Sequence, residues 1–177
     1  NYLRNLPALQ GVDQKFFDEC LPHFRFKGEV WAIEEGTPVF PQEPLLQVTA
    51  ALPEAQLAET ALLALIGFQT SVASRAVRIV DAAAGRSVVE FGARRAHGLE
   101  AGVYAARAAF LGGCDATSNV DAGRRFDIPV SGTMAHSWVT AFPDELSAFR
   151  AYADVFGDRT VALLDTYDTV AAVRAVA

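Results

Sequence analysis

The sequence predicts an α/β fold in two parts, and three observations support this prediction. Residues 53–84 have the composition of one long helix, and Gly85 follows it as a C-cap. After Gly85, short apolar runs alternate with helical segments, which is typical of βα repeats with parallel strands. Before residue 53, two segments of alternating polarity indicate strands. We therefore expect an α+β domain over residues 1–85 and the start of a βα barrel, or of an open α/β sheet, over residues 86–177.

The composition is that of a globular, acidic protein. Of the 177 residues, 51% are hydrophobic and 20% are charged, and the formal net charge is −6. Such a chain is not expected to bind nucleic acid, and no unbroken apolar run of about 18 residues predicts a membrane span. Cys20 and Cys114 fit no metal or disulfide spacing, which predicts a reduced, cytoplasmic protein. The chain starts without Met or a signal-peptide pattern and ends inside a helical segment, so we expect flanking sequence.

One helix and two strands are predicted before the long helix. Apolar residues recur at helical spacing over residues 13–22. Residues 28–33 alternate between polar and apolar side chains, and residues 44–50 form a second strand-like segment. The long helix begins with Pro53, which suits a first-turn position. Gly67, near the middle of that helix, indicates a break or a close contact with another helix.

After Gly85 the pattern alternates between strand and helix. The predicted strands are residues 87–91, 129–132 and 160–164, and residues 111–114 are predicted as a tight strand or turn. The predicted helices are residues 100–110, 118–126, 143–156 and the segment from 170 onward. Ser118 is the expected N-cap of the second of these helices. The continuous apolar run at 160–164 is typical of a parallel strand that is covered on both faces.

Polar and mostly small residues follow all four of these predicted strands. Ligands of parallel α/β folds bind beyond the carboxyl ends of the strands, where the following loops meet. The segments at these positions are residues 92–95, 115–119, 132–137 and 165–169. Their shared position predicts a site for an anion or a nucleotide.

The first two strand ends carry candidate anion-binding groups. Arg94 and Arg95 follow the first strand, and a guanidinium grips carboxylate or phosphate with two hydrogen bonds. Surface arginines are the alternative interpretation, and the position at the strand end favours a functional role. Thr117, Ser118 and Asn119 stand at a helix start, where N–H groups and hydroxyls bind anions. Ordinary N-capping is the alternative for these three residues and is the commoner role.

The third and fourth strand ends carry the candidate nucleophile and carboxylates. His136 is the only histidine predicted beyond a strand of the barrel, and Gly132 allows a tight turn or a close ligand. Its imidazole suits a base, an acid, a ligand or a phosphoryl acceptor, and packing near the core is the alternative. Asp165 and Asp168 suit ribose hydroxyls or water-bridged Mg²⁺. Because Asp168 or Thr169 also suits an N-cap, Asp165 is the better candidate.

Several common site signatures are missing from the sequence. There is no phosphate-binding loop of the P-loop type and no glycine-rich dinucleotide fingerprint after a strand. Clusters of His and Cys with metal-ligand spacing are also missing. A bound nucleotide would therefore use the strand-end loops rather than either of these motifs.

Four motifs in order resemble those of the nicotinate phosphoribosyltransferases. They are FGARRA at 91–96, ATSNVDAG at 116–123, PVSGTMAHSW at 129–138 and LDTYDT at 164–169. Residues 36–45 and 59–63 also fit, so the resemblance covers essentially the whole chain. Several motifs in the right order are far more specific than any one of them alone. Asp127 departs from the pattern, since glycine is expected there.

The resemblance implies a type II phosphoribosyltransferase. Its fold would be an α/β sandwich-type domain with a long connecting helix over residues 1–85, followed by the first part of an incomplete parallel βα barrel over residues 86–177. The implied reaction joins nicotinate to phosphoribosyl pyrophosphate (PRPP) and gives nicotinate mononucleotide and pyrophosphate in NAD salvage. The implied energy source is ATP, through a phosphohistidine. Mg²⁺ is the implied metal, and a homodimer is the implied assembly.

The resemblance also assigns roles to residues of this sequence. The phosphorylated histidine of the family falls on His136, and the arginine for the nicotinate carboxylate falls on Arg94. Asp165 would face the ribose or Mg²⁺. The residues implied to line the same pocket are Gly132, Thr133 and Ser137. We expect the side chains of His136 and Arg94 to converge on one anion pocket.

Other interpretations of the sequence stay open. The protein resembles nicotinamide or quinolinate phosphoribosyltransferases less closely, because the segment at 132–137 favours nicotinate. A catalytically inactive homologue or fragment with a structural role is a second alternative. A βα-barrel aldolase or isomerase would need a lysine beyond a strand, and the only lysines, Lys15 and Lys27, lie in the first domain.

Overall fold

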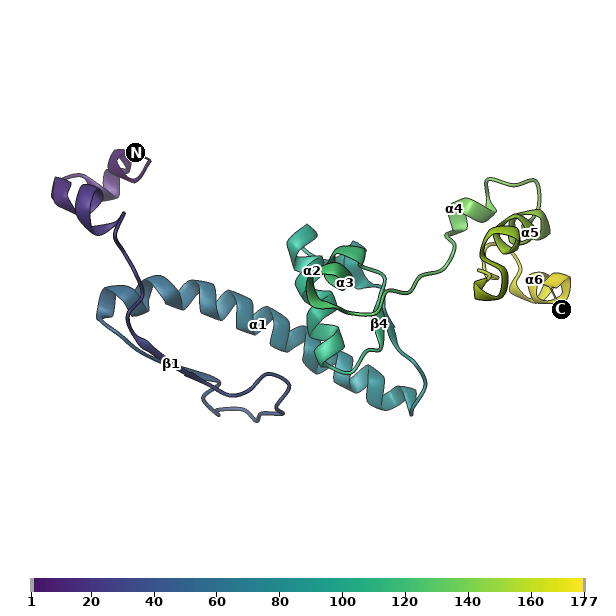
Figure 1. The fold of residues 1–177 in the computed structure, drawn as a ribbon, viewed down its shortest axis with the longest axis horizontal. Coiled ribbons are helices and arrows are strands. Elements are labelled where there is room, and N and C mark those ends of the chain that lie inside the picture. The colour runs from purple at the N-terminus through teal and green to yellow at the C-terminus, as the bar shows by residue number, and fades with distance from the viewer. Residues whose placement is uncertain (1, 177) are drawn as a thin grey trace. The chain divides into compact units, whose positions relative to one another are not determined.

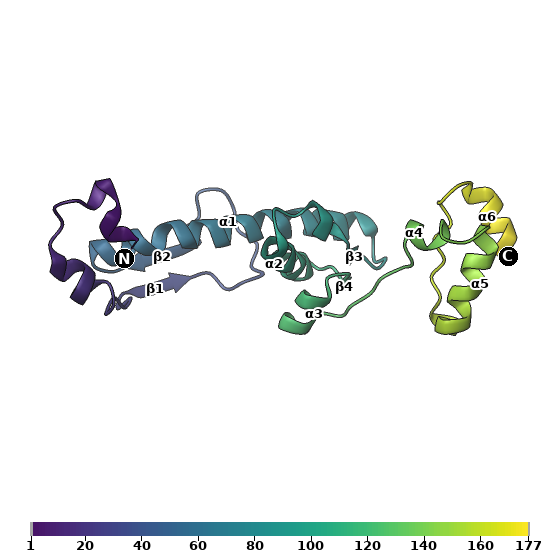
Figure 2. The ribbon, with the colours of Figure 1, turned by 90° about the horizontal axis from the view of Figure 1, so that it is seen from above.

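The structure is a computed structural model, and it describes residues 2–176 (Figure 1; Figure 2). It is mixed α/β and mostly helical, which confirms the mixed class. The chain divides into two compact units, Asn1–Ser71 and Val72–Ala177, and the division lies inside the long helix α1 (Leu52–Ala83). The sequence places a domain boundary at Gly85 instead, and that boundary stays a prediction.

The first unit contains short helical turns and a β-hairpin. The turns come first in the chain, at Leu3–Asn5, Pro7–Leu9 and Phe16–Cys20. The last of them is a π-helical turn within the predicted helix at 13–22. β1 (Glu29–Ala32) and β2 (Leu46–Thr49) pair antiparallel, with Glu29 opposite Thr49. Both strands lie where alternating polarity predicts them.

Helix α1 is continuous from Leu52 to Ala83, so the break predicted at Gly67 is wrong. A methyl group added at Gly67 would meet nothing within 4 Å, so no close helix contact requires this glycine either. The chain leaves the helix through Ala84 and Gly85, which have φ values of +50° and +83°. By length and composition, α1 is the one helix of residues 2–176 that meets the requirement for crossing a membrane. The sequence carried no unbroken apolar run because Gln69, Thr70 and Ser71 interrupt it.

A small parallel sheet organises the second unit. β3 (Val89–Glu90) pairs parallel with β4 (Ala116–Thr117), and Val130 joins Thr117 through a single parallel bridge. The predicted parallel pairing of the first strands is therefore confirmed. The second strand is displaced from the predicted range 111–114, because residues 112 and 113 turn the chain out of the preceding helix before β4 begins.

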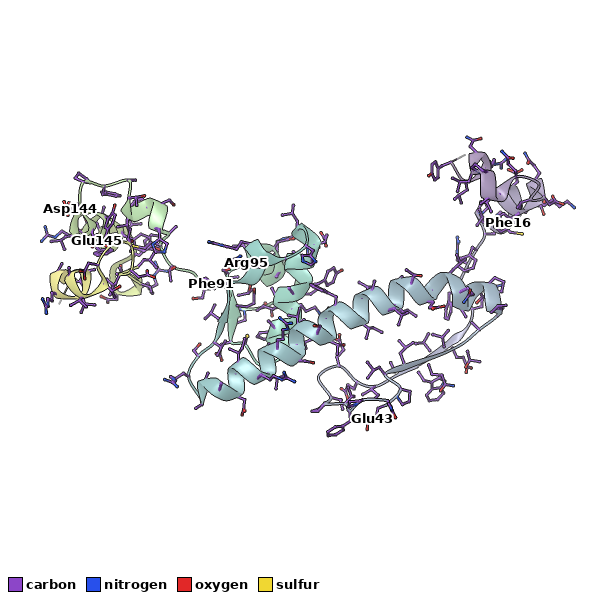
Figure 3. All side chains as sticks on the ribbon, turned by 180° about the vertical axis from the view of Figure 1, so that it is seen from behind. Phe16, Glu43, Phe91, Arg95, Asp144 and Glu145 are labelled. Atoms are coloured by element: carbon purple, nitrogen blue, oxygen red, sulfur yellow. The ribbon has the colours of Figure 1, made fainter. Side chains whose placement is uncertain are left out.

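The helices of the second unit lie where the sequence predicts them, except for the short helix α4, which was not predicted. They are α2 (Leu99–Leu111), α3 (Val120–Phe126), α4 (His136–Val139), α5 (Glu145–Phe156) and α6 (Thr169–Val176), with a short 3₁₀ turn at Gly157–Arg159 after α5. Asp144, labelled in Figure 3, precedes α5. It caps this helix, because its carboxylate accepts hydrogen bonds from the Ser147 N–H and hydroxyl, each at 2.8 Å. These two hydrogen bonds hold the pKa of Asp144 below its usual range.

The predicted barrel is not seen in residues 2–176. The described strands form two sheets of two strands each, and the predicted strand at 129–132 is reduced to the bridge at Val130. The predicted strand at 160–164 is not a strand. Its apolar side chains at 162–164 instead pack on a cluster formed by α4, α5 and α6. A parallel strand requires a neighbouring strand for its ladder, and an apolar run alone does not supply one.

Small residues form most of the core of the second unit. Ala76 of α1 packs with Ala109 of α2 and with Cys114, and Val72, Val80 and Val88 surround them. A methyl group added at Gly112 would lie 2.7 Å from the Ala76 Cβ and 2.8 Å from the Ala73 carbonyl oxygen. Gly112 therefore allows the end of α2 to approach the backbone of α1. Separate clusters centre on Ala106 with Ala122, and on Phe149 with Val139.

Candidate active site

The first strand end of the second unit carries the arginine pair. After β3, Phe91 leads into the 3₁₀ turn Gly92–Arg95, and both Arg94 and Arg95 lie in its last part with exposed side chains (Figure 3). The turn is closed by a 3.2 Å hydrogen bond from the Ala96 N–H to the Ala93 carbonyl. It packs on α2, which starts just after it. The two side chains are therefore exposed to solvent at this strand end, and their binding of an anion stays a prediction.

The second strand end is anchored by a buried threonine. Thr117 has no exposed surface, and its hydroxyl donates to Glu90 Oε2 at 2.7 Å and accepts from the Asn119 N–H at 3.0 Å. Asn119 caps α3, because its side-chain oxygen accepts from the Ala122 N–H at 3.0 Å. The prediction that Ser118 is the N-cap is therefore wrong by one residue. The Ser118 N–H instead donates to the Glu90 carbonyl at 2.9 Å and extends the β3–β4 pairing.

The first three strand ends meet at one edge of the parallel sheet. The Thr117 N–H donates to the Pro129 carbonyl, and the Ser131 N–H donates to the Thr117 carbonyl, each at 3.0 Å. Because parallel segments end on the same side, Gly132 lies at the same edge as the two other strand ends, next to the Thr117–Asn119 turn and separated from the arginine turn by β4. Gly132 has open space around it and no left-handed φ, so the described backbone alone does not require glycine there.

His136 opens the short helix α4 and faces two residues that follow the apolar segment at 160–164. Its Nδ1 lies 3.3 Å from the Thr166 hydroxyl, and its Nε2 lies 4.0 Å from Asp165 Oδ1. The His136 side chain is 57% exposed, so an incoming phosphoryl group can reach it. Trp138 fixes α4 by donating to the Ala148 carbonyl at 3.1 Å, and Val139 of the same helix is buried.

The two aspartates of this segment have different partners. Asp168 accepts a hydrogen bond from the Ala171 N–H at 2.9 Å and so caps α6. Asp165 is exposed and faces His136. Thr166, which contacts the imidazole, was missed by sequence reasoning. Its position between Asp165 and Asp168, in a polar segment that follows a predicted strand, is the only sequence signal that pointed to it.

The remaining predicted pocket residues flank His136 in the chain. The Thr133 hydroxyl donates to the Met134 carbonyl at 3.0 Å, and the Ser137 carbonyl accepts from the Thr140 hydroxyl at 3.2 Å. No hydrogen bond or ion pair within residues 2–176 joins Arg94 or Arg95 to His136. Their convergence on one anion pocket stays a prediction, as do the assigned roles of these residues.

The described side chains include no cluster of three or more His, Cys, Asp or Glu residues that would hold a metal by themselves. Mg²⁺ does not need such a cluster, because it keeps several waters and is bound through one or two carboxylates and the phosphates of a substrate. An exposed carboxylate beside an exposed imidazole, as at Asp165 and His136, fits this mode of binding. The imidazole also has the exposure that a phosphoryl acceptor requires.

Comparison with known proteins gives two family matches along the chain. A model described as the nicotinate phosphoribosyltransferase (NAPRTase) N-terminal domain matches residues 1–67. A model described as the nicotinate phosphoribosyltransferase (NAPRTase) family matches residues 86–172, which include the three joined strand ends and the His136 segment.

Curated relatives and solved structures agree with these matches. The chain is 49% identical over 170 residues to nicotinate phosphoribosyltransferase pncB2 of Mycobacterium tuberculosis, which covers 94% of this chain and 36% of that protein. It is 51% identical over 140 residues to nicotinate phosphoribosyltransferase of Bacillus subtilis, covering 79% and 28%. The crystal structure of human nicotinic acid phosphoribosyltransferase matches 95% of this chain and 43% of its own, with 32% identity and a TM-score of 0.83.

A second structure is similar over a smaller part of the chain. The crystal structure of nicotinate-nucleotide pyrophosphorylase from Pyrococcus furiosus covers 81% of this chain and 37% of its own, with 33% identity and a TM-score of 0.74. The chain thus spans about a third of the length of the curated relatives that it matches.

Proposed function

The chain belongs to the nicotinate phosphoribosyltransferase family, and we propose that it supplies part of the site that transfers phosphoribosyl from PRPP to nicotinate. The products would be nicotinate mononucleotide and pyrophosphate, as a step of NAD salvage. The proposal concerns the whole protein, because the chain spans about a third of the length of its relatives. The arrangement of His136 beside Asp165 and Thr166 is the observation that carries it.

His136 is the proposed phosphoryl acceptor. One imidazole nitrogen would attack the γ-phosphorus of ATP, an N–P bond would form, and the bond to the bridging oxygen would break and release ADP. Asp165 would stabilise the positive charge that the ring gains, since it lies 4.0 Å from Nε2. Phosphorylation places a near-dianion at the mouth of the site and so changes the affinity for the other substrates and the product. Water would later cleave the N–P bond, and that cycle would couple ATP to product formation.

Arg94 is the proposed partner of the nicotinate carboxylate, with Arg95 beside it. A bidentate guanidinium pairs with a carboxylate and not with the neutral amide of nicotinamide. Leaving such a charged group unpaired costs about 2 kcal/mol or more, which suffices for a clear preference between the two substrates. Thr117, Ser118 and Asn119 stand at the adjacent strand end. Gly132, Thr133 and Ser137 would complete the lining next to His136.

Loss of pyrophosphate from PRPP builds positive charge on the ribose carbon and negative charge on the leaving group. Catalysis therefore depends on holding nicotinate in line and on neutralising the pyrophosphate. Asp165 would hold Mg²⁺ through water or bind the ribose hydroxyls. When bound, Mg²⁺ would neutralise the charge of the phosphate oxygens. We further propose that the protein is cytoplasmic and forms a homodimer. Sedimentation of the purified protein would test the dimer.

Labelling with γ-³²P-ATP tests the role of His136. The full-length protein should take up phosphate that is labile in acid and stable in base, and His136→Asn should abolish both the label and the stimulation of product formation by ATP. His23→Asn is the matched control, because His23 is an exposed histidine whose Nδ1 lies 2.8 Å from the Glu19 carbonyl oxygen. Full ATP stimulation in His136→Asn would contradict the proposal.

A pyrophosphorylase of the kind found in Pyrococcus furiosus is the second candidate, because that structure matches 81% of the chain at 33% identity. Assays of the full-length protein with nicotinate, nicotinamide and quinolinate separate the candidates. Activity with nicotinate alone supports the main proposal. Activity with quinolinate or nicotinamide favours the corresponding enzyme, and inactivity with all three, in a protein that remains folded, favours a structural role.

A further inference from the structure

Glu90, the last residue of β3, has no role in the proposed reaction, yet its carboxylate joins both turns that carry the candidate anion-binding residues. One oxygen, Oε1, accepts a short hydrogen bond from the Gly92 N–H at the start of the arginine turn. The other oxygen, Oε2, accepts from the Thr117 hydroxyl at 2.7 Å, at the end of β4. A single half-buried side chain is thus shared between two strand ends that are 27 residues apart in the chain.

The connection continues from Thr117 into the second turn. The Thr117 hydroxyl gives its proton to Glu90 and accepts from the Asn119 N–H at 3.0 Å. Because Thr117 has no exposed surface, water cannot replace either partner. The hydrogen bonds therefore run from the backbone of Gly92 through Glu90 and Thr117 to the backbone of Asn119.

Gly92 leaves room for this contact. A methyl group added there would lie 2.8 Å from Glu90 Oε1, so the carboxylate would have to shift. A carboxylate also accepts hydrogen bonds through both oxygens and donates none, which matches one backbone N–H and one hydroxyl. The amide of glutamine offers one accepting oxygen and one donating nitrogen, so it cannot reproduce both contacts.

We propose that Glu90 is a positioning residue of the nicotinate site, which holds the turn of Arg94 and Arg95 in a fixed place relative to the turn of Ser118 and Asn119. This inference rests on the proposed function. Glu90 touches neither substrate nor reacting atoms and acts through the arginine turn. An exposed turn of four residues has several conformations in solution, and a fixed carboxylate at its first N–H selects one of them. Loss of Glu90 should therefore weaken nicotinate binding more than it slows the chemical step.

The same sheet offers a matched control at its opposite end. The Asp115 carboxylate accepts from the Ser87 hydroxyl at 2.9 Å and from the Val88 N–H at 2.8 Å, so it also joins β3 to β4 through one hydroxyl and one backbone N–H. No hydrogen bond within residues 2–176 joins Asp115 to the arginine turn or to the Asn119 turn. Both of its hydrogen bonds end on one oxygen, so Asp115→Asn keeps an acceptor there but removes the charge that strengthens them. This variant makes the same acid-to-amide change as Glu90→Gln and should weaken the sheet while it leaves the substrate turns in place.

The experiment compares Glu90→Gln, Thr117→Val, Thr117→Ser and Asp115→Asn in the full-length protein. Each variant is measured for the KM for nicotinate, kcat, thermal midpoint and amide exchange of residues 92–95 and 118–119. We expect Glu90→Gln and Thr117→Val to raise the KM for nicotinate about tenfold, with kcat changed by less than about threefold, as for loss of a hydrogen bond to a charged group. Thr117→Ser, which keeps the hydroxyl, should recover most of the loss seen in Thr117→Val. Both turns should exchange faster in Glu90→Gln than in Asp115→Asn.

Three results would overturn the inference. One is an unchanged KM for nicotinate in Glu90→Gln. Another is a rise in this KM in Asp115→Asn as large as that in Glu90→Gln, which would show that a weaker sheet alone explains the change. If Glu90→Gln does not fold, an unchanged KM in Thr117→Val has the same meaning. If the wild-type protein does not turn over nicotinate, both the proposed function and this inference are wrong. If the wild-type protein is active and Glu90→Gln leaves the KM for nicotinate unchanged, only the inference is wrong.

Discussion

The two compact units differ in what holds them together. No residue between positions 2 and 71 is buried, whereas the buried apolar side chains of the described chain all lie from Ala76 onward. β1 and β2 are joined by the hydrogen bonds of their antiparallel pairing, and the side chains of β2 are at most half-buried. Periodicity is thus sufficient to form an element, but only close packing fixes one arrangement of several elements.

The residues at the contacts show the same difference. The first unit exposes large side chains, among them Trp31, Phe40 and Leu52. The second unit buries small ones, such as Ala106, Ala108 and Ala122, which let helices and strands approach closely. Size and apolar character alone therefore do not decide which residues enter the core of the described chain.

The largest contrast should appear between two phenylalanines. Phe149 of α5 is 4% exposed and lies in the cluster with Val139, so Phe149→Ala should destabilise the second unit by about 3–5 kcal/mol. Phe40 of the first unit is 73% exposed, and Phe40→Ala should change stability by no more than about 0.5 kcal/mol. Chemical denaturation of the two variants measures both. Equal losses would show that Phe40 is buried in the folded protein and would contradict the comparison.

Two glycines should respond in opposite directions. A methyl group at Gly112 meets Ala76 and the Ala73 carbonyl, so Gly112→Ala should destabilise by about 1–3 kcal/mol. The space at Gly67 is open, so Gly67→Ala should stabilise α1 by about 0.5–1 kcal/mol through its better helix propensity. Thermal midpoints of the two variants provide the test. A loss of stability in Gly67→Ala would reveal a close neighbour at that position.

Acid should lower the stability of the second unit, and the contribution of a single carboxylate such as Asp115 should be smaller than the effects of the substitutions above. Hydrogen bonds from the Val88 N–H and the Ser87 hydroxyl hold the pKa of Asp115 below its usual range. A lowered folded-state pKa means that this contribution to stability is complete above the unfolded pKa of about 3.9 and is lost as pH falls through the folded value. Thermal midpoints measured between neutral pH and about pH 2 should fall less steeply for Asp115→Asn than for the wild type. Parallel curves for the two proteins would exclude this role of Asp115.

Much of the fold could be predicted where the cause is local. The predicted helices at 53–84, 100–110 and 143–156 coincide closely with α1, α2 and α5, because periodicity and capping lie within each segment. The N-cap of α3 was misplaced because Ser118 and Asn119 are both good caps. Their backbone hydrogen bonds select Asn119, since the Ser118 N–H is used by β3.

Other predictions failed because they depend on a partner elsewhere in the chain. The segment at 160–164 has the composition of a buried strand, but its apolar side chains pack on helices and its backbone has no adjacent strand within residues 2–176. Asp127 shows the converse case. The family pattern led us to expect glycine there, and Asp127 does adopt a left-handed conformation, with φ of +54°, at the end of α3. Aspartate tolerates this conformation better than most residues do.

The sequence by itself determined the long helices α1, α2 and α5, the parallel sense of β3 and β4, and the family, because each of these depends on motifs or periodicity along the chain. Only the tertiary structure showed that Glu90 is shared by two turns and that Thr166 meets His136. Such contacts join residues that are about 30 positions apart. No periodicity encodes them, since hydrogen bonds depend on distance and direction in space rather than on separation in the chain.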